Sequence, residues 1–163
     1  MLAYLCGPID SAAGGGQLWR RKLAPFLRDQ LGHRVYDPSE EALKALTEEE
    51  AANLHVWQTT DLERFRRVVR KIIAHNMGLI ENRADYVICY VEPGVSLDSA
   101  ASAALTAAYR KAIPVYLVTP QPIESVDAWF LGCSDQVFST VEDLKEYLAS
   151  RFSREKQTQL WSD

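Results

Sequence analysis

The sequence has 163 residues, of which 47% are hydrophobic and 25% are charged, as is typical of one soluble globular domain. The formal net charge of −4 argues against binding to a nucleic-acid polymer, and no apolar run is long enough to span a membrane. The three cysteines and an N-terminus without a basic leader lead us to expect reduced thiols and a cytoplasmic protein. Neither cysteines nor histidines have metal-ligand spacing, so we expect no metal and no cofactor.

Five short apolar segments predict β-strands. Residues 85–91 and 114–119 are nearly continuous apolar runs, which is typical of strands covered on both faces. The predicted strands are Leu2–Cys6, Arg34–Asp37, Asp85–Val91, Pro114–Thr119 and Gln136–Phe138.

Segments with helical periodicity separate these strands. Gln17–Leu31 has an apolar stripe, and Pro25 within it predicts a kink or a later start. Leu62–Ile80 has a second apolar stripe, and a capping box of Ser139 and Glu142 predicts the start of the last helix. Residues 39–58 are further helical sequence, which we expect to cover a ligand crevice.

The alternation of strands and helices predicts an α/β fold, with a parallel sheet and helices on both faces. We expect a flavodoxin-like, Rossmann-like strand order 2-1-3-4-5 in a single domain, residues 1–152. Residues 153–163 form a polar C-terminal tail. Its Trp161 has two equal interpretations, docking on a domain of this or a neighbouring subunit, or disorder.

This strand order places a ligand crevice at the carboxyl ends of the first and third strands, where loops 7–17 and 92–98 meet. The glycine run 14–16 in the first loop fits a phosphate cradle and a flexible surface loop equally well. It matches neither the dinucleotide-binding nor the P-loop spacing. Residues 120–135 form a long connection, in which Trp129 and Phe130 are candidates for base stacking, for subunit contact or for anchoring the loop on its own core.

Several side chains at the crevice are candidates for chemistry. Cys6 has no histidine near it in the sequence, which favours a small buried residue over a nucleophile. Asn76 falls on an apolar helix stripe, where it is either a structural amide or a ligand contact. Four acids converge on the crevice and indicate a polyhydroxylated ligand or acid–base chemistry, although Asp98 also suits a simple helix N-cap. The four acids are Asp10, Asp37, Glu92 and Asp98.

Four segments together resemble the nucleoside 2-deoxyribosyltransferase family. They are YLCGPID (4–10), HRVYDP (33–38), HNMGLIENRADYVICYVE (75–92) and SLDSAASAALTAAYRKAIPVYLV (96–118). The resemblance implies cleavage of the N-glycosidic bond of a deoxynucleoside or deoxynucleotide through a covalent deoxyribosyl-glutamate, followed by transfer to a free nucleobase. It also implies a homo-oligomer, in which a neighbouring subunit completes the pocket.

The resemblance places three residues in the catalytic machinery. Asp98 falls on the family's aspartate, and Asn76 stands where many members have an aspartate. Six residues after Asp98 the family has its nucleophilic glutamate, and this sequence has Ala104. The predicted substrate-binding residues are Tyr4, Cys6, Gly7, Pro8, Asp10, Trp19, Asp37, Glu92, Gly94 and Ser102.

An alanine cannot act as a nucleophile, and three explanations are open, in order of preference. The chain is an engineered Glu-to-Ala variant, or a natural non-catalytic relative, or another acid such as Glu92 serves instead. Two other functions also stay open. One is hydrolysis of (deoxy)nucleoside 5'-monophosphates on the same fold, and the other is non-catalytic nucleotide binding.

Overall fold

The computed structural model describes residues 1–8, 15–92 and 99–160. Its centre is a five-stranded, all-parallel sheet in the order β2-β1-β3-β4-β5, so the predicted strand order is confirmed. The strands are β1 Leu2–Cys6, β2 Arg34–Tyr36, β3 Tyr86–Tyr90, β4 Val115–Val118 and β5 Gln136–Phe138. All five predicted strands are present, three of them shorter than predicted by one or two residues.

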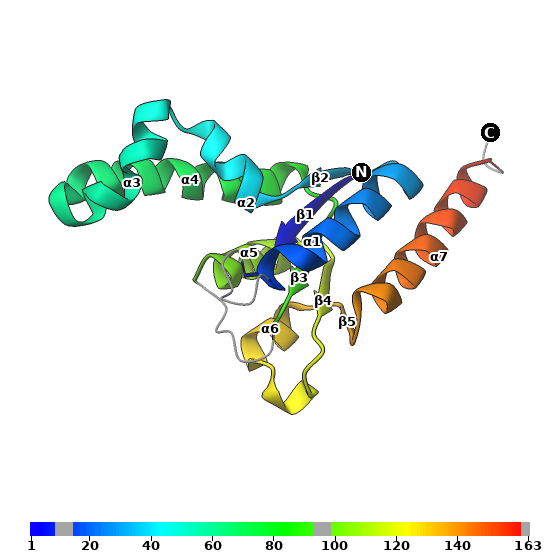
Figure 1. Cartoon of the computed structure of the whole chain (residues 1–163). Coiled ribbons are helices and arrows are strands. Elements are labelled where there is room, and N and C mark those ends of the chain that lie inside the picture. The colour runs from blue at the N-terminus through cyan, green and yellow to red at the C-terminus, as the bar shows by residue number, and fades with distance from the viewer. Residues whose placement is uncertain (9–14, 93–98, 161–163) are drawn as a thin grey trace.

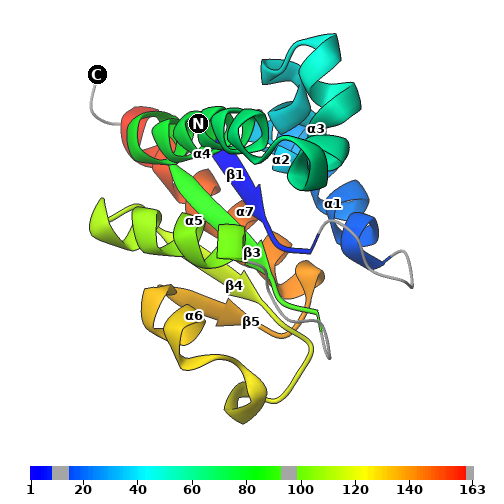
Figure 2. The same ribbon diagram turned by 90° about the vertical axis from the view of Figure 1, so that its left-hand side faces the viewer.

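The helices lie on both faces of the sheet (Figures 1 and 2). The α-helices are α1 Gly15–Pro25, α2 Pro38–Glu41, α3 Glu48–Thr60, α4 Leu62–Arg83, α5 Ser99–Arg110, α6 Ala128–Cys133 and α7 Val141–Leu160. The shorter elements are η1 Phe26–Gln30, a π-helix, and two 3-10 helices, η2 Ala42–Ala45 and η3 Ile123–Ser125.

Two apolar layers enclose the sheet because successive strand side chains point to opposite faces. In β1, Ala3 and Leu5 pack with α1 and α7, whereas Tyr4 and Cys6 pack with α4, α5 and α6. The central strands β3 and β4 are buried along nearly their whole length, as their continuous apolar sequence predicts. Within the described residues, no helix combines the length and the apolar character that crossing a membrane requires.

Pro25 changes the type of helix rather than delaying its start. It ends α1, and the chain continues as the π-helix η1, with the Leu31 N–H donating to the Phe26 carbonyl at 3.3 Å. Because proline has no N–H to donate, an ordinary α-helical hydrogen bond is missing at this position, and the wider turn follows it.

Helix α3 and the first half of α4 form a helical hairpin that extends away from the sheet (Figure 1). A capping box of Thr47 and Glu50 begins α3, and Asp61 caps α4. Lys71 of α4 donates to Glu50 of α3, which ties the two helices together. No residue of α3 is buried, because this hairpin lies beyond the edge of the sheet.

Helix α7 differs from its predicted start by one residue. Its capping box consists of Thr140 and Asp143, with each backbone N–H donating to the other side chain at 3.1 and 3.0 Å, so the predicted box of Ser139 and Glu142 is wrong. Both pairs are three residues apart, so their spacing in the sequence does not show which of them forms the capping box. The helix also runs through the predicted boundary at residue 153 as far as Leu160.

Candidate functional site

A pocket of about 510 Å³ lies beside the carboxyl end of β1, between α4 and α5. We call it the α4–α5 pocket. Its lining is mostly apolar, and five predicted site residues belong to it: Tyr4, Cys6, Gly7, Asn76 and Ala104. The other lining residues are Leu5, Arg20, Pro38, Val69, Ile72, Ile73, Met77, Ala100, Ala101 and Ala103. Volume and lining are those of a small-molecule site.

Helix α5 forms one wall of the pocket with small side chains only. Ala104 is 2% exposed and packs in the core beneath this wall, next to Ala101. The Cys6 thiol lies 3.9 Å from the Ala101 carbonyl oxygen, so Cys6 is the small buried residue that its sequence context predicts. All three cysteines are free and buried. The residues of α5 that line the pocket are all alanines, which leaves the space between α5 and α4 open.

Helix α4 forms the opposite wall. Its predicted apolar stripe lines the pocket at Val69, Ile72 and Ile73 rather than filling the core, because this half of α4 lies outside the sheet. Asn76 accepts a hydrogen bond at Oδ1 from the Tyr36 hydroxyl at 2.9 Å. Its partner is therefore a side chain, not the backbone. Its Nδ2 has no partner among the described residues and can donate to a ligand in the pocket.

Tyr36 is held in place by neighbours on both sheet and helix. Its ring stacks on Tyr4, with 5.3 Å between the ring centroids. Burial raises the pKa of Tyr36 to about 12, and the charges of Glu41 and Asp37 act in the same direction. The phenol therefore stays protonated at neutral pH and donates to Asn76.

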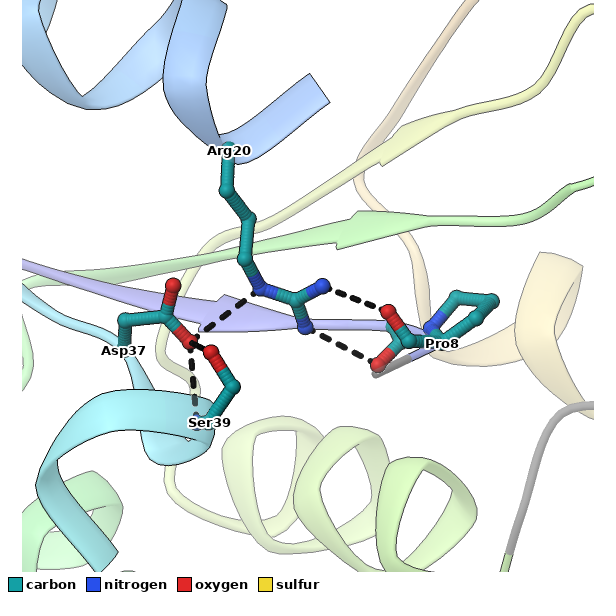
Figure 3. Close-up of polar contacts among 5 residues, drawn as sticks. Pro8, Arg20, Asp37 and Ser39 are labelled. Atoms are coloured by element: carbon teal, nitrogen blue, oxygen red, sulfur yellow. Dashed lines mark hydrogen bonds and ion pairs between the residues drawn. The ribbon is translucent and has the colours of Figure 1, made fainter. Parts of the chain in front are cut away.

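Arg20 organises the end of the pocket nearest the β1 loop (Figure 3). Its Nε donates to Asp37 Oδ1 at 3.1 Å, and its two terminal nitrogens donate to the carbonyls of Pro8 at 2.5 Å and Gly7 at 2.9 Å. Asp37 Oδ1 also accepts from the backbone N–H and the hydroxyl of Ser39, at 2.9 and 2.7 Å. One buried ion pair thus fixes both the Gly-Pro turn after β1 and the start of α2.

The electrostatics of Arg20 are those of a structural group. Burial lowers the pKa of the guanidinium, and the Asp37 carboxylate opposes this effect. Arginine remains charged at neutral pH even so, and here its charge is taken up by Asp37 and two carbonyls. Arg20 is not among the site residues that the sequence predicts. It lies three residues before Leu23 and seven before Leu27, and therefore on the buried apolar stripe of α1. This position is the sequence signal of a buried, structural arginine.

Position 7 requires a glycine because of its backbone conformation and its close neighbours. Its φ is +140°, and a Cβ at this position would lie 2.6 Å from the Tyr90 carbonyl oxygen and 3.4 Å from the Trp19 ring. Such close approach is possible only without a side chain. The glycine therefore lets the end of β1 pass directly against the end of β3.

Three predicted site residues lie elsewhere. Trp19 and Glu92 line a separate groove of about 340 Å³ on the α1 and α7 face of the sheet. Ser102 lines a groove on the outer side of α5 with Thr106 and Trp129. Glu92 is therefore not brought together with Ala104, and the described lining of the α4–α5 pocket contains no carboxylate.

The two aromatic residues of the 120–135 connection have different positions. Phe130 is buried in the core and anchors α6, whereas Trp129 is exposed and its Nε1 donates to Thr106 Oγ1 at 2.9 Å. Asp10, Gly94, Asp98 and Trp161 lie outside the described residues. Helix α5 begins at Ser99. The described residues contain no group of His, Cys, Asp and Glu that is suited to a metal ion.

Comparisons with known proteins support the fold alone. No protein-family model and no curated protein matches the sequence. Among solved structures, the chain is similar to a conserved protein from Enterococcus faecalis V583, with a TM-score of 0.61 and 18% sequence identity. The match covers 93% of this chain and 98% of that chain. The likeness extends over the whole α/β domain and carries no information about activity.

Proposed function

We propose that the protein is a nucleoside 2'-deoxyribosyltransferase scaffold that binds a deoxynucleoside or deoxynucleotide in the α4–α5 pocket. With Ala104 at the position of the nucleophilic glutamate, it forms no deoxyribosyl-enzyme and transfers no sugar. The observation that carries this proposal is that one pocket contains Ala104, Asn76 and the Gly7 turn, which come from three separate segments of the family resemblance.

The chemistry of the lining is consistent with this role. Apolar groups of α4 offer a surface for a nucleobase, while Asn76 Nδ2 is available to hydrogen-bond a ligand. No described residue of the pocket offers a carboxylate for attack on an anomeric carbon. Glu92 lines the other groove, which weakens the explanation that it replaces the missing glutamate.

The decisive experiment restores the carboxylate. Ala104→Glu is assayed for exchange of base between a 2'-deoxynucleoside and a free nucleobase, and for hydrolysis, beside the unmodified chain. We expect turnover only in Ala104→Glu, and nucleoside binding in the unmodified chain by titration calorimetry. Ala103→Glu is the matched control, because it adds the same carboxylate to the same pocket wall from an exposed neighbouring position.

Different outcomes separate the alternatives. Binding without turnover in a folded Ala104→Glu protein indicates a natural non-catalytic nucleoside-binding protein. Tighter binding of 5'-monophosphates than of nucleosides, with a strong salt dependence, favours the nucleotide hydrolase scaffold. Absence of both turnover in Ala104→Glu and binding in the unmodified chain contradicts the proposal.

A further inference from the structure

A cleft of about 490 Å³ lies at the open edge of the sheet, beside β2, which is the outermost strand on that side. We call it the β2-edge cleft. Its lining comes from both faces of the sheet, because Leu2 and Tyr36 belong to the apolar layer of α4 and α5, whereas Val35 packs with the layer of α1 and α7. The cleft shares no lining residue with the α4–α5 pocket, so the two cavities are separate.

Three arginines from three different elements line the β2-edge cleft. Arg28 belongs to η1, Arg34 to β2, and Arg83 is the last residue of α4. All three are exposed, so a molecule in the cleft can reach their side chains. Because strand side chains alternate between the two faces, Arg34 lies on the α4 face, opposite to Val35, while η1 packs with the other layer. Positive charge therefore comes to this edge from both faces of the sheet.

The charge of these arginines is not neutralised within the described part of the chain, where none of the three forms an ion pair. Glu41 is the one carboxylate among the described lining residues, and its Oε1 accepts from Lys44 at 2.6 Å. Three like charges in one cleft repel one another, and they are gathered here in a protein whose formal net charge is −4. A bound anion would offset this repulsion, so the charge favours an anionic ligand.

The edge strand adds a backbone donor and limits the kind of ligand. The Arg34 N–H donates toward β1, to the Met1 carbonyl at 2.9 Å. Because successive N–H groups of a strand point to opposite sides, the Val35 N–H points to the open edge, where Val35 lines the cleft. The strand has only three residues, of which Val35 is the one with an outward N–H. Such an edge is too short to pair with an added peptide strand, which favours a small molecule.

The donors of the cleft suit a phosphate group. Guanidinium groups bind phosphate and carboxylate through pairs of hydrogen bonds, and backbone N–H groups are common further donors to phosphate. A phosphate monoester carries a charge of about −1.5 to −2 at neutral pH and three acceptor oxygens, so it matches three guanidiniums better than a carboxylate with one charge and two oxygens. We infer that the β2-edge cleft is a binding site for the phosphate group of a small molecule, held by Arg28, Arg34, Arg83 and the Val35 N–H.

The rest of the lining leaves room for an organic part of the ligand. Leu2 and Leu79 provide apolar contacts, and the volume of the cleft lies within the range of small-molecule sites. The inference does not rest on the proposed function, because it uses no residue of the α4–α5 pocket.

The test compares three probes by titration calorimetry on the full chain, namely inorganic phosphate, phenyl phosphate and benzoate. We expect saturable binding of phosphate or phenyl phosphate, and Arg34→Gln and Arg83→Gln should each weaken it about tenfold, the effect of losing one charge-assisted contact. In a ¹⁵N spectrum of the assigned protein, the bound phosphate should shift the Val35 N–H signal. Tighter binding of phenyl phosphate assigns the cleft to an organic phosphate ester, and equal affinities assign it to free phosphate.

Arg67→Gln is the matched control. It removes the same charge from an exposed arginine of α4 that does not line the cleft, and we expect unchanged binding. Equal losses in Arg67→Gln and Arg83→Gln would show a general effect of charge and overturn the inference. It is also overturned if neither phosphate probe binds saturably, or if benzoate binds as tightly as phenyl phosphate. Nucleoside binding to the α4–α5 pocket is measured separately, so either proposal can fail alone.

Discussion

The Arg20 guanidinium and the Asp37 carboxylate form a buried ion pair, with 3.1 Å between Nε and Oδ1, that joins α1 to the carboxyl end of β2. The same guanidinium holds the carbonyls of Gly7 and Pro8. These contacts bring the ends of the first two strands together at one edge of the α4–α5 pocket (Figure 3). The geometry of the pocket therefore depends on an interaction that has no chemical role in the proposed reaction.

Removing Arg20 should destabilise the protein strongly. Arg20→Met leaves the Asp37 charge buried without its partner and frees two carbonyls, so we expect a loss of about 3–5 kcal/mol in the free energy of unfolding. Urea denaturation measures the change. Lys44→Met is the control, because Lys44 and Glu41 form an exposed pair, and its removal should change stability by no more than about 1 kcal/mol. Equal effects of the two substitutions contradict this account.

A side chain at position 7 should be tolerated poorly. In Gly7→Ala the new methyl group meets the Tyr90 carbonyl at 2.6 Å, and the backbone is already at a φ of +140°. We expect a loss of about 1–3 kcal/mol, seen as a lower midpoint of thermal unfolding. Gly78 lies on α4, and a Cβ added there has no other atom within 4 Å. Gly78→Ala should therefore stabilise the protein by about 0.5–1 kcal/mol. Unchanged stability in Gly7→Ala would show that the β1–β3 contact can relax.

The strand order follows from the sequence because the apolar runs and the helices between them leave few right-handed topologies. The predicted pocket residues of β1, α4 and α5 also meet in one cavity, since parallel strands bring their carboxyl ends to one edge. Periodicity cannot show which face of the sheet a residue at that edge belongs to. Trp19 and Glu92 therefore fit the crevice in the sequence, but line the groove on the other face.

The helical hairpin was the least predictable part of the fold. A polar segment such as 39–58 shows helical sequence but little apolar signal for where it packs, and α3 has no buried residue. The sequence predicts that the apolar stripe of α4 packs in the core, whereas Ile73 of this stripe is more than half exposed and lines the pocket. A stripe that faces a cavity and a stripe that faces the core have the same spacing.

Alkaline pH should destabilise the protein through its buried tyrosines. Burial raises the pKa of both Tyr36 and Tyr116 to about 12, from an ordinary value of 10.0. Between these values the folded protein keeps phenolic protons that the unfolded chain has lost, so stability falls as the pH rises through this window, by roughly 1.4 kcal/mol per pH unit for each phenol. Urea denaturation at several pH values measures the slope.

Removing one of these phenols provides the control for the alkaline prediction. Tyr36 and Tyr116 should contribute equally to the fall in the free energy of unfolding with rising pH. Tyr116→Phe should therefore remove about half of their joint contribution and leave the contribution of Tyr36 unchanged. A titration of tyrosinate absorbance on the folded protein should show both phenols ionising at a higher pH than an ordinary tyrosine, whose pKa is 10.0. A slope that is the same in Tyr116→Phe and in the unmodified chain contradicts the assignment.

The hydrogen bond from Tyr36 to Asn76 should couple β2 to the ligand-binding wall of α4. Tyr36→Phe removes the donor and leaves Asn76 Oδ1 unpaired, so we expect a loss of about 1 kcal/mol in stability. Asn76→Ala should lose a similar amount, and the double variant should lose less than the sum, with a coupling of about 0.5–1.5 kcal/mol. Nucleoside affinity should fall more in Asn76→Ala than in Tyr36→Phe, because only the first substitution removes Nδ2. Additive stability losses would show that the 2.9 Å contact contributes nothing to the fold, and equal affinity losses would show that Nδ2 does not bind the ligand.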